Sequence, residues 1–455
     1  MNITPVIDYL EKHKDQHLKE LIEFLKIPSI SALKKHKPDI EKAADFMVNK
    51  LEELDLDVEK IQTPGNPLVY AQSKKMDPSK KTLLFYGHYD VQPVDPIDLW
   101  DYPPFEPTIV NDTIYARGVS DDKGQLYSHL MAIEAFRQTS TEIPVNIKII
   151  FEGEEEGGGE NIYKFTENNP EKLACDAVII SDTSQYNENT PAICYSLKGI
   201  VYMEFRVKGS GMDLHSGSFG GVVKNACNGL AEIIADLKNK DGVIQIPGFY
   251  DNVLELEQSE KEEFASLQYS DEVLKKDTGS SAPHGEKGYT TLERMWGRPT
   301  LDVNGIWGGY SGEGGKTIIP STAGAKVSMR LVPNQNPQRI AKLFREYVLQ
   351  VAHPSLEVEV DTLHTAVPVL IPRDHEITQS GINALEKGFA NKAKFIREGG
   401  SIPIVATFQK SLKAPVLLLG YGLPNDNIHS PNERYLLQNF YNGNKTTAYL
   451  FDELS

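Results

Sequence analysis

Five histidine and carboxylate side chains follow predicted strands, and their residue types could hold metal ions. They are His88, Asp121, Glu156, Asp182 and His429. His88 ends the apolar run 83–87, and Asp90 shares its face of the strand, because residues two apart point the same way. A ligating histidine usually donates its other ring N–H to an acceptor, so Asp90 is a candidate to orient His88. Taken alone, such a pair is more often a solvent-facing histidine beside a turn aspartate, and the metal interpretation depends on the other candidate ligands.

The number of candidate ligands favours two ions over one. A single tetrahedral zinc ion needs only four ligands including water. Two histidines and three carboxylates suit two ions, each with one histidine and one terminal carboxylate, joined by a bridging carboxylate and a water. Such an ion pair generates hydroxide at neutral pH and polarises a carbonyl group. Glu155, beside Glu156, would be the general base for that water.

The glutamate run 154–156 has a second interpretation. Three adjacent glutamates repel one another and usually lie on a solvated loop. Here the run follows the buried strand predicted for residues 145–151 and precedes three glycines, which let backbone approach another group closely. A cation between the carboxylates would remove the repulsion.

The apolar patterns predict the elements that position these residues. Helical spacing predicts helices over 4–25, 41–54, 125–138, 378–389 and 436–454, and apolar runs predict buried strands at 68–71, 82–86, 145–151, 177–181 and 416–419. Strands that alternate with helices indicate an α/β domain with a mixed, mostly buried sheet and flanking helices. In such a sheet, ligands gather at the carboxyl ends of the strands.

The pattern changes after about residue 198. Residues 202–209 and 326–332 alternate between apolar and polar side chains, which is typical of antiparallel strands with one wet face. Helices are predicted at 225–237 and 337–351, and the first pattern resumes after Pro372. We therefore expect a discontinuous catalytic domain, residues 1–198 and 373–455, with a smaller α+β domain, residues 199–372, inserted into it.

Composition limits the partners. The chain has 455 residues, of which 40% are hydrophobic and 24% charged, as in soluble globular proteins. Its formal charge of −17 argues against nucleic acid and anionic membranes. No apolar run approaches the roughly 20 residues of a membrane span. The N-terminus lacks a signal-peptide core, and the three widely spaced cysteines suit a reducing compartment, so we expect a cytoplasmic protein.

Together these motifs resemble the M20 family of metallopeptidases, within it the cytosolic non-specific dipeptidase and carnosine dipeptidase branch. The matching stretches are GHYDVQP, RGVSDDKGQ, FEGEEEGGGE, ISD, DLHSG, KTIIP, SMRLVPN, REGGSIP and HSPNE. The resemblance implies two divalent ions per subunit, Zn²⁺ or Mn²⁺. His88 and Asp182 would hold one ion, Glu156 and His429 the other, and Asp121 would bridge them. It also implies a cis peptide after Asp121, with Asp90 orienting His88 and Glu155 acting as base.

The resemblance extends to the inserted domain, which would serve as lid and dimerisation domain. His215 resembles the residue that reaches from the partner subunit to the tetrahedral oxyanion, which implies a homodimer. Arg330 resembles the arginine that grips the substrate carboxylate, a task suited to guanidinium. The branch also contacts substrate at positions matching Thr317, His364, Gly400 and Ser401, although each could be structural. Glu154 and the sequence 302–305 depart from the branch pattern, and we expect Glu154 to add charge beside the base.

These implications converge on a dipeptidase that hydrolyses short peptides with a free C-terminus, using a hydroxide held by two metal ions and a glutamate base. An N-acyl-amino-acid deacylase or desuccinylase of the same superfamily is the nearest alternative. An inactive binding or scaffold homologue is the alternative from another class, although every ligand and Glu155 are present.

Overall fold

The computed structural model describes residues 1–400 and 402–455, and the chain forms two compact units. The first comprises residues 1–195, 371–396 and 404–455, and the second residues 196–370 and 397–403. The predicted segmentation placed residues 397–403 in the first domain, whereas in the structure they group with the second unit. Arg397 pairs with the buried Glu260, and the Lys198 N–H donates to the Glu398 carbonyl, so this segment is held by the second unit.

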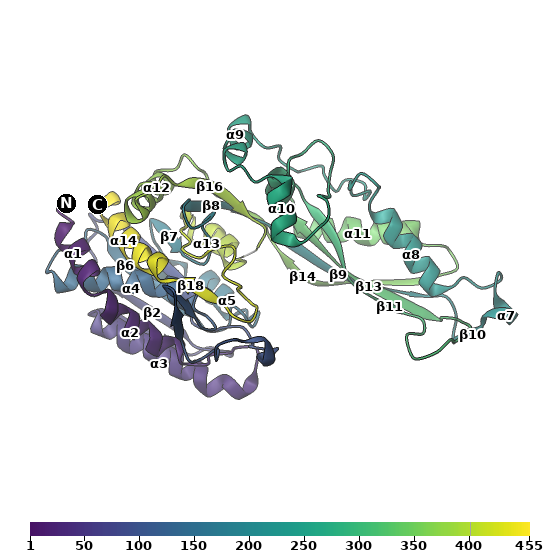
Figure 1. Ribbon diagram of the computed structural model, residues 1–455, viewed down its shortest axis with the longest axis horizontal. Coiled ribbons are helices and arrows are strands. Elements are labelled where there is room, and N and C mark those ends of the chain that lie inside the picture. The colour runs from purple at the N-terminus through teal and green to yellow at the C-terminus, as the bar shows by residue number, and fades with distance from the viewer. Residues whose placement is uncertain (401) are drawn as a thin grey trace. The chain divides into compact units, whose positions relative to one another are not determined.

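The first unit is built on a mixed sheet (Figure 1). β3 lies parallel to both β6 and β7, and β17 lies parallel to β7, whereas β1 pairs with β2 and β2 with β6 in antiparallel fashion. The strand order is β1 (Leu56–Ile61), β2 (Leu68–Ser73), β6 (Asn146–Glu152), β3 (Thr82–His88), β7 (Ala177–Ile180), β17 (Val416–Leu418) and β8 (Ala192–Leu197). The strands β15 (Val369–Leu370) and β16 (Lys394–Glu398) also pair with β8.

Helices cover both faces of this sheet. Phe85 and Tyr86 on β3 point to opposite faces, where Phe85 packs on Phe451 and Tyr86 on Phe408. The Phe451 side is covered by α1 (Thr4–Lys12), α2 (Lys14–Leu25), α3 (Lys37–Glu53), α4 (Lys123–Gln138), α12 (Glu376–Phe389) and α14 (Leu437–Glu453). The Phe408 side is covered by α5 (Asn161–Asn168), α6 (Pro170–Leu173) and α13 (Ile404–Leu412). The predicted fold class, a mostly buried mixed sheet with flanking helices, is confirmed.

Smaller elements complete the first unit. The single helix predicted over 4–25 is two helices, because His13 leaves helical geometry with φ −108° and ψ 15°. A small sheet contains β4 (Thr108–Val110), β5 (Thr113–Tyr115) and β18 (Arg434–Leu436), and short 3₁₀ turns occupy Lys34–His36 and Ile97–Leu99.

The second unit is a four-stranded antiparallel sheet with helices on one face, the predicted α+β fold. Its strand order is β11 (Thr300–Gly308), β13 (Thr322–Leu331), β9 (Gly199–Lys208) and β14 (Glu357–Ala366). The buried residues of β9 and β13 form one core with α8 (Ala226–Leu237) and α11 (Pro337–Val351). Around them lie β10 (Leu214–His215), α7 (Ser216–Phe219), α9 (Gln258–Ser266), α10 (Asp271–Thr278), a π-helical turn (Glu293–Gly297) and β12 (Ile318–Ile319).

Two general features concern the surroundings of the protein. None of the helices in the described part of the chain combines the length and hydrophobicity of a membrane span. The three cysteines, Cys175, Cys194 and Cys227, are free thiols.

Candidate metal centre

The carboxyl ends of parallel strands bring the candidate ligands together in the first unit. His88 is the last residue of β3, Glu155 and Glu156 follow β6, and Asp182 follows β7. His429 lies in the loop between β17 and β18. Because β3, β6, β7 and β17 run parallel, these loops leave the sheet at one edge, where ligand sites are usual in α/β sheets.

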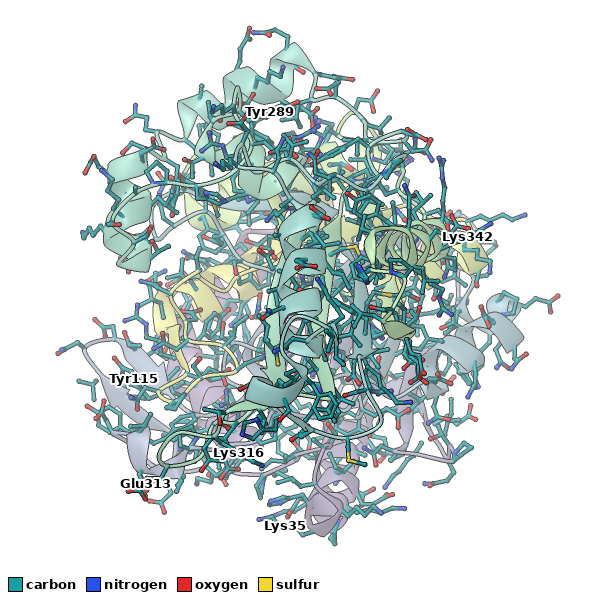
Figure 2. The ribbon with its side chains drawn as sticks, turned by 90° about the vertical axis from the view of Figure 1, so that its right-hand side faces the viewer. Lys35, Tyr115, Tyr289, Glu313, Lys316 and Lys342 are labelled. Atoms are coloured by element: carbon teal, nitrogen blue, oxygen red, sulfur yellow. The ribbon has the colours of Figure 1, made fainter. Side chains whose placement is uncertain are left out.

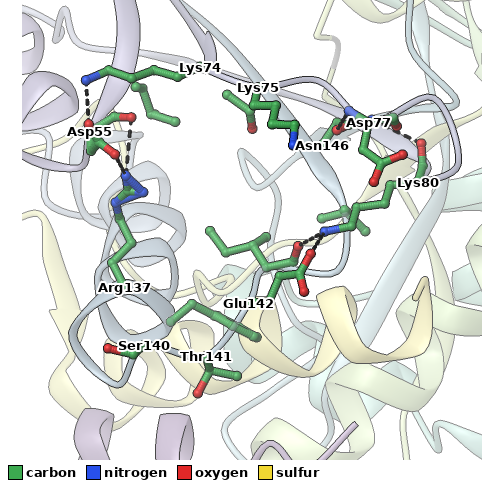
Figure 3. A pocket seen from close by; sticks show the side chains of 15 residues that line it. Asp55, Lys74, Lys75, Asp77, Lys80, Arg137, Ser140, Thr141, Glu142 and Asn146 are labelled. Carbon is green, nitrogen blue, oxygen red and sulfur yellow. Dashed lines mark hydrogen bonds and ion pairs between the residues drawn. The ribbon is translucent and has the colours of Figure 1, made fainter.

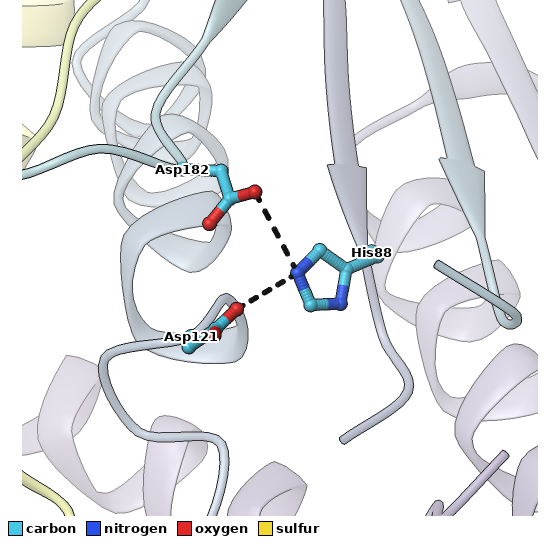
Figure 4. Close-up of side chains that lie close together, drawn as sticks. All are labelled: His88, Asp121 and Asp182. Carbon is cyan, nitrogen blue, oxygen red and sulfur yellow. Dashed lines mark hydrogen bonds and ion pairs between the residues drawn. The ribbon is translucent and has the colours of Figure 1, made fainter. Parts of the chain in front are cut away.

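Two groups of three potential ligands share Asp121. In the first group, His88 Nε2 lies 3.0 Å from Asp121 Oδ1 and 3.9 Å from Asp182 Oδ2 (Figure 4). In the second group, His429 Nε2 lies 2.9 Å from Asp121 Oδ2 and 3.3 Å from Glu156 Oε2. Each oxygen of the Asp121 carboxylate therefore faces a different histidine.

The chemistry of these donors suits cations. His88 Nδ1 lies 3.1 Å from the Asp90 carbonyl oxygen, which only accepts, so Nδ1 carries a proton; in the neutral imidazole Nε2 then keeps the lone pair that a metal ligand needs. A lone pair that faces carboxylate oxygens is repelled unless a positive charge lies between them. Burial, and then the charge of Asp121, raise the pKa of the Asp182 carboxyl well above its usual range. A divalent ion in each group would neutralise this excess of negative charge.

Asp90 contacts both His88 and the glutamate loop. Its carboxylate lies 3.5 Å from His88 Nδ1, further than its own backbone carbonyl. The same carboxylate accepts hydrogen bonds from the backbone N–H groups of Glu155 (3.2 Å) and Glu156 (3.0 Å). Asp90 thus fixes the loop that carries the candidate base as well as the histidine.

Glu155 is half-buried beside the two groups, and Glu154 points elsewhere. Burial raises the pKa of the Glu155 carboxyl to about 7, and the nearby charges of Glu156 and Asp121 act in the same direction. The Glu154 carboxylate accepts from the N–H groups of Asn66 (3.0 Å) and Asn161 (3.0 Å). The bond from Asn161 stabilises the start of α5. The expectation that Glu154 adds charge beside the base did not include this contact.

The loop that carries Asp121 depends on Glu433, which the sequence analysis did not single out. This buried carboxylate accepts from the N–H groups of Gly118 (2.8 Å), Ser120 (3.0 Å) and Asp121 (3.1 Å), and it pairs with Arg117 at 2.8 Å. The Asp121–Asp122 peptide is cis, as the resemblance implied. Glu433 lies four residues after His429 in HSPNE, and that spacing was the available signal.

Three further residues shape the site. Gln92 Nε2 donates to Glu156 Oε2 at 2.7 Å, and its position in GHYDVQP was the only hint of that contact. A Cβ on Gly87 would lie 2.7 Å from Asp122 Oδ2, so glycine allows the start of α4 to approach β3. His429 adopts a φ of 59°, which is uncommon for a residue other than glycine and recurs at functional sites.

The second unit holds the remaining predicted residues in separate places. His215 lies on β10 and is paired with Ile318. The N–H of Ser216, the residue after His215, donates to the Thr317 carbonyl, so His215 and Thr317 are neighbours. Glu313 and Lys316 are exposed on the loop that leads to Thr317 (Figure 2). Arg330 is on β13 and His364 on β14, Gly400 is exposed in the segment 397–403, and Ser401 lies outside the described residues.

A cavity of about 570 Å³ in the first unit does not involve these residues (Figure 3). It is lined by basic side chains, but Lys74 and Arg137 both pair with Asp55, and Lys80 pairs with Glu142. These three basic side chains are therefore already paired with carboxylates at the surface.

Comparison with known proteins identifies the family. Residues 84–453 match the model of peptidase family M20/M25/M40. The chain is 35% identical to the Cys-Gly metallodipeptidase dug1 of Schizosaccharomyces pombe, covering 100% of this chain and 99% of that protein. It is 29% identical to the human Beta-Ala-His dipeptidase, covering 100% and 93%. The solved structure of the di-peptidase Dug1p from Saccharomyces cerevisiae superimposes with a TM-score of 0.84 at 31% identity, covering 100% and 98%.

The fold and the site thus define a hydrolase of the metallopeptidase class. The chain belongs to the M20 peptidase family.

Proposed function

We propose that this protein is a dipeptidase that uses two divalent metal ions and Glu155 as general base. The observation that carries the proposal is the pair of ligand groups that share Asp121, with the half-buried carboxyl of Glu155 beside them. The names of the relatives support peptide substrates, since the S. pombe relative is a Cys-Gly metallodipeptidase.

Each of the two ligand groups would hold one ion. His88 and Asp182 would bind one, Glu156 and His429 the other, and Asp121 both. When bound, two such ions supply Lewis-acid chemistry that activates water and polarises a carbonyl. Zn²⁺ and Mn²⁺ both suit this mixture of imidazole and carboxylate ligands.

The protein's own part in the reaction is proton transfer and binding. Glu155 would take a proton from the attacking water and return it to the leaving amine, a role suited to a group whose pKa lies near the working pH. Asp90 would keep Glu155 in place through the backbone of its loop. In the second unit, Arg330 would bind the C-terminal carboxylate of the substrate, bidentate in the manner of guanidinium groups.

A substrate panel tests this function. The metal-loaded protein is expected to hydrolyse unmodified dipeptides at least tenfold faster than N-acetyl or N-succinyl amino acids, measured by release of amino acids. A preference for the acylated compounds would assign the protein to the deacylases. If the protein hydrolyses neither the dipeptides nor the acylated amino acids, the proposal is contradicted.

We also propose a homodimer in which His215 serves the partner subunit's site. His215 is exposed and its Nδ1 accepts from the Gly217 N–H at 3.1 Å, which leaves Nε2 as the donor that an oxyanion requires. Exposed apolar side chains nearby support a contact surface: Met212 (68%), Phe219 (44%) and Val222 (78%). Sedimentation equilibrium should give twice the chain mass of 50.7 kDa. A monomer mass at working concentration would contradict this arrangement.

A further inference from the structure

The sheet of the second unit has one face that its helices do not cover. Along β9, the side chains of Val201, Met203, Phe205 and Val207 are buried in the core with α8 and α11. The alternate residues Ile200, Tyr202, Glu204 and Arg206 point to the opposite side, because successive strand residues alternate between faces. We call these residues and their cross-strand partners the open face.

The two ends of the open face differ in character. At one end, Arg206 pairs with Glu204 on its own strand and with Asp361 (3.4 Å) and Glu359 (3.8 Å) on β14. Such ion pairs are ordinary on a solvated antiparallel sheet. The other end carries Arg330, which is paired in register with Ile200.

Tyr202 lies on the central strand β9, at the end of the open face that carries Arg330. In the register, Tyr202 is opposite Ser328 on β13 and opposite His364 on β14. Arg330 is two residues from Ser328, so it is a diagonal neighbour of Tyr202. Diagonal neighbours on one sheet face are roughly 7–8 Å apart at their backbones, within reach of aromatic and long side chains.

Both edge strands are irregular, and the shift in β14 lies at the level of Tyr202. β14 shifts register between Thr362 and His364, and β11 shifts between Val303 and Gly305. In β14 the extra residue is Leu363, and the shift brings His364, instead of Leu363, opposite Tyr202. Bulges are frequent beside active sites, where they re-aim a side chain. The β14 bulge thus sets which side chain stands beside Tyr202, whereas the β11 shift lies further along the sheet, beside the partners of Met203 and Glu204.

The electrostatics of the Arg330 end favour an anion. Arg330 is half-buried, and burial lowers the pKa of its guanidinium. The neighbouring Lys198 is buried, and its pKa falls to about 8 because of burial first and the charge of Arg330 next. The charge of Asp302 acts on Lys198 in the opposite direction, and a carboxylate bound beside Arg330 would offset the repulsion between the two cations further.

We infer that Tyr202 is a substrate-binding residue, and that its hydroxyl donates a hydrogen bond to the C-terminal carboxylate that Arg330 binds. The inference rests on the proposed function and adds a residue to it. A phenol donates to a carboxylate without adding charge, and hydrogen bonds to charged groups are the stronger ones. Tyr202 would thereby help to restrict the enzyme to substrates with a free C-terminus.

The variant Tyr202→Phe removes only the hydroxyl and tests the inference. With a dipeptide substrate, KM is expected to rise about tenfold or more while kcat stays within about twofold, because the lost contact is present throughout the reaction. Tyr347→Phe is the matched control, since Tyr347 lies on α11 and donates to the Asp236 carbonyl at 3.1 Å. That variant should match the wild type.

A C-terminally amidated dipeptide tests whether the Tyr202 hydroxyl contacts the substrate carboxylate or instead affects binding of any substrate. The wild type should bind it more weakly, and Tyr202→Phe should cause no further loss. An unchanged KM for the free dipeptide, or an equal loss for the amide, would overturn the inference.

Binding affinity measured by calorimetry distinguishes a failure of the Tyr202 inference from a failure of the proposed dipeptidase function. If the wild type binds the dipeptide without cleaving it, the dipeptidase proposal fails, and a tenfold weaker affinity of Tyr202→Phe still supports the inference. If the wild type binds no free dipeptide, the inference fails as well.

Discussion

Replacing Asp121 with alanine is expected to remove both metal ions and to lower kcat/KM by about 1,000-fold or more. Asp121 is the one residue common to the two ligand groups, and its two oxygens lie 3.0 Å and 2.9 Å from His88 Nε2 and His429 Nε2. Without it, each ion would keep one histidine and one carboxylate, and the bridge would be lost. Metal ions contribute several kcal/mol to transition-state stabilisation, which corresponds to an effect of this size.

Metal analysis of the purified variants distinguishes the bridge from the terminal ligands. Two equivalents of metal are expected in the wild type and fewer than one in Asp121→Ala. His429→Ala changes only the second group, so it should retain the ion held by His88 and Asp182. Asp98→Ala, on an exposed turn, controls for the loss of an aspartate elsewhere. Two tightly bound equivalents in Asp121→Ala would contradict the bridging role.

The sheet could be predicted because its signal is local. Continuous apolar runs at β3, β6 and β7 indicate strands buried on both faces, and the polar residues that end them mark one sheet edge. The helix break at His13 has no such signal, since neither glycine nor proline stands there. The segment 397–403 also could not be assigned from sequence, because the Arg397–Glu260 contact joins residues 137 positions apart.

The candidate ligands could be predicted from their residue types and positions, but the contacts that hold them in place could not. His88 and Asp182 follow apolar strands, so their sequence positions already indicate the sheet edge. The position of Glu433 in HSPNE does not reveal its partners, and only folding brings its carboxylate to three backbone N–H groups of the Asp121 loop. The bulge that places His364 opposite Tyr202 is likewise a product of strand pairing.

Glu155→Gln is expected to lower kcat by about 100- to 10,000-fold while both metal ions remain bound. General-base catalysis contributes an effect of this size, and an amide cannot take a proton from water. Glu155 is not in either ligand group, so its replacement leaves the five candidate ligands intact. Glutamine has nearly the same shape, and the hydrogen bond to Asp90 uses the backbone N–H of residue 155, which the variant keeps.

The combination of lost turnover and retained metal separates a base from a ligand. Asp121→Ala should lose both properties, whereas Glu155→Gln should lose only turnover. Glu160→Gln is the matched control, because Glu160 follows on the same loop and pairs with Lys164 at the surface. It should keep both metal and turnover. Normal turnover in Glu155→Gln would remove Glu155 from the mechanism, and loss of metal in that variant would make it a ligand instead.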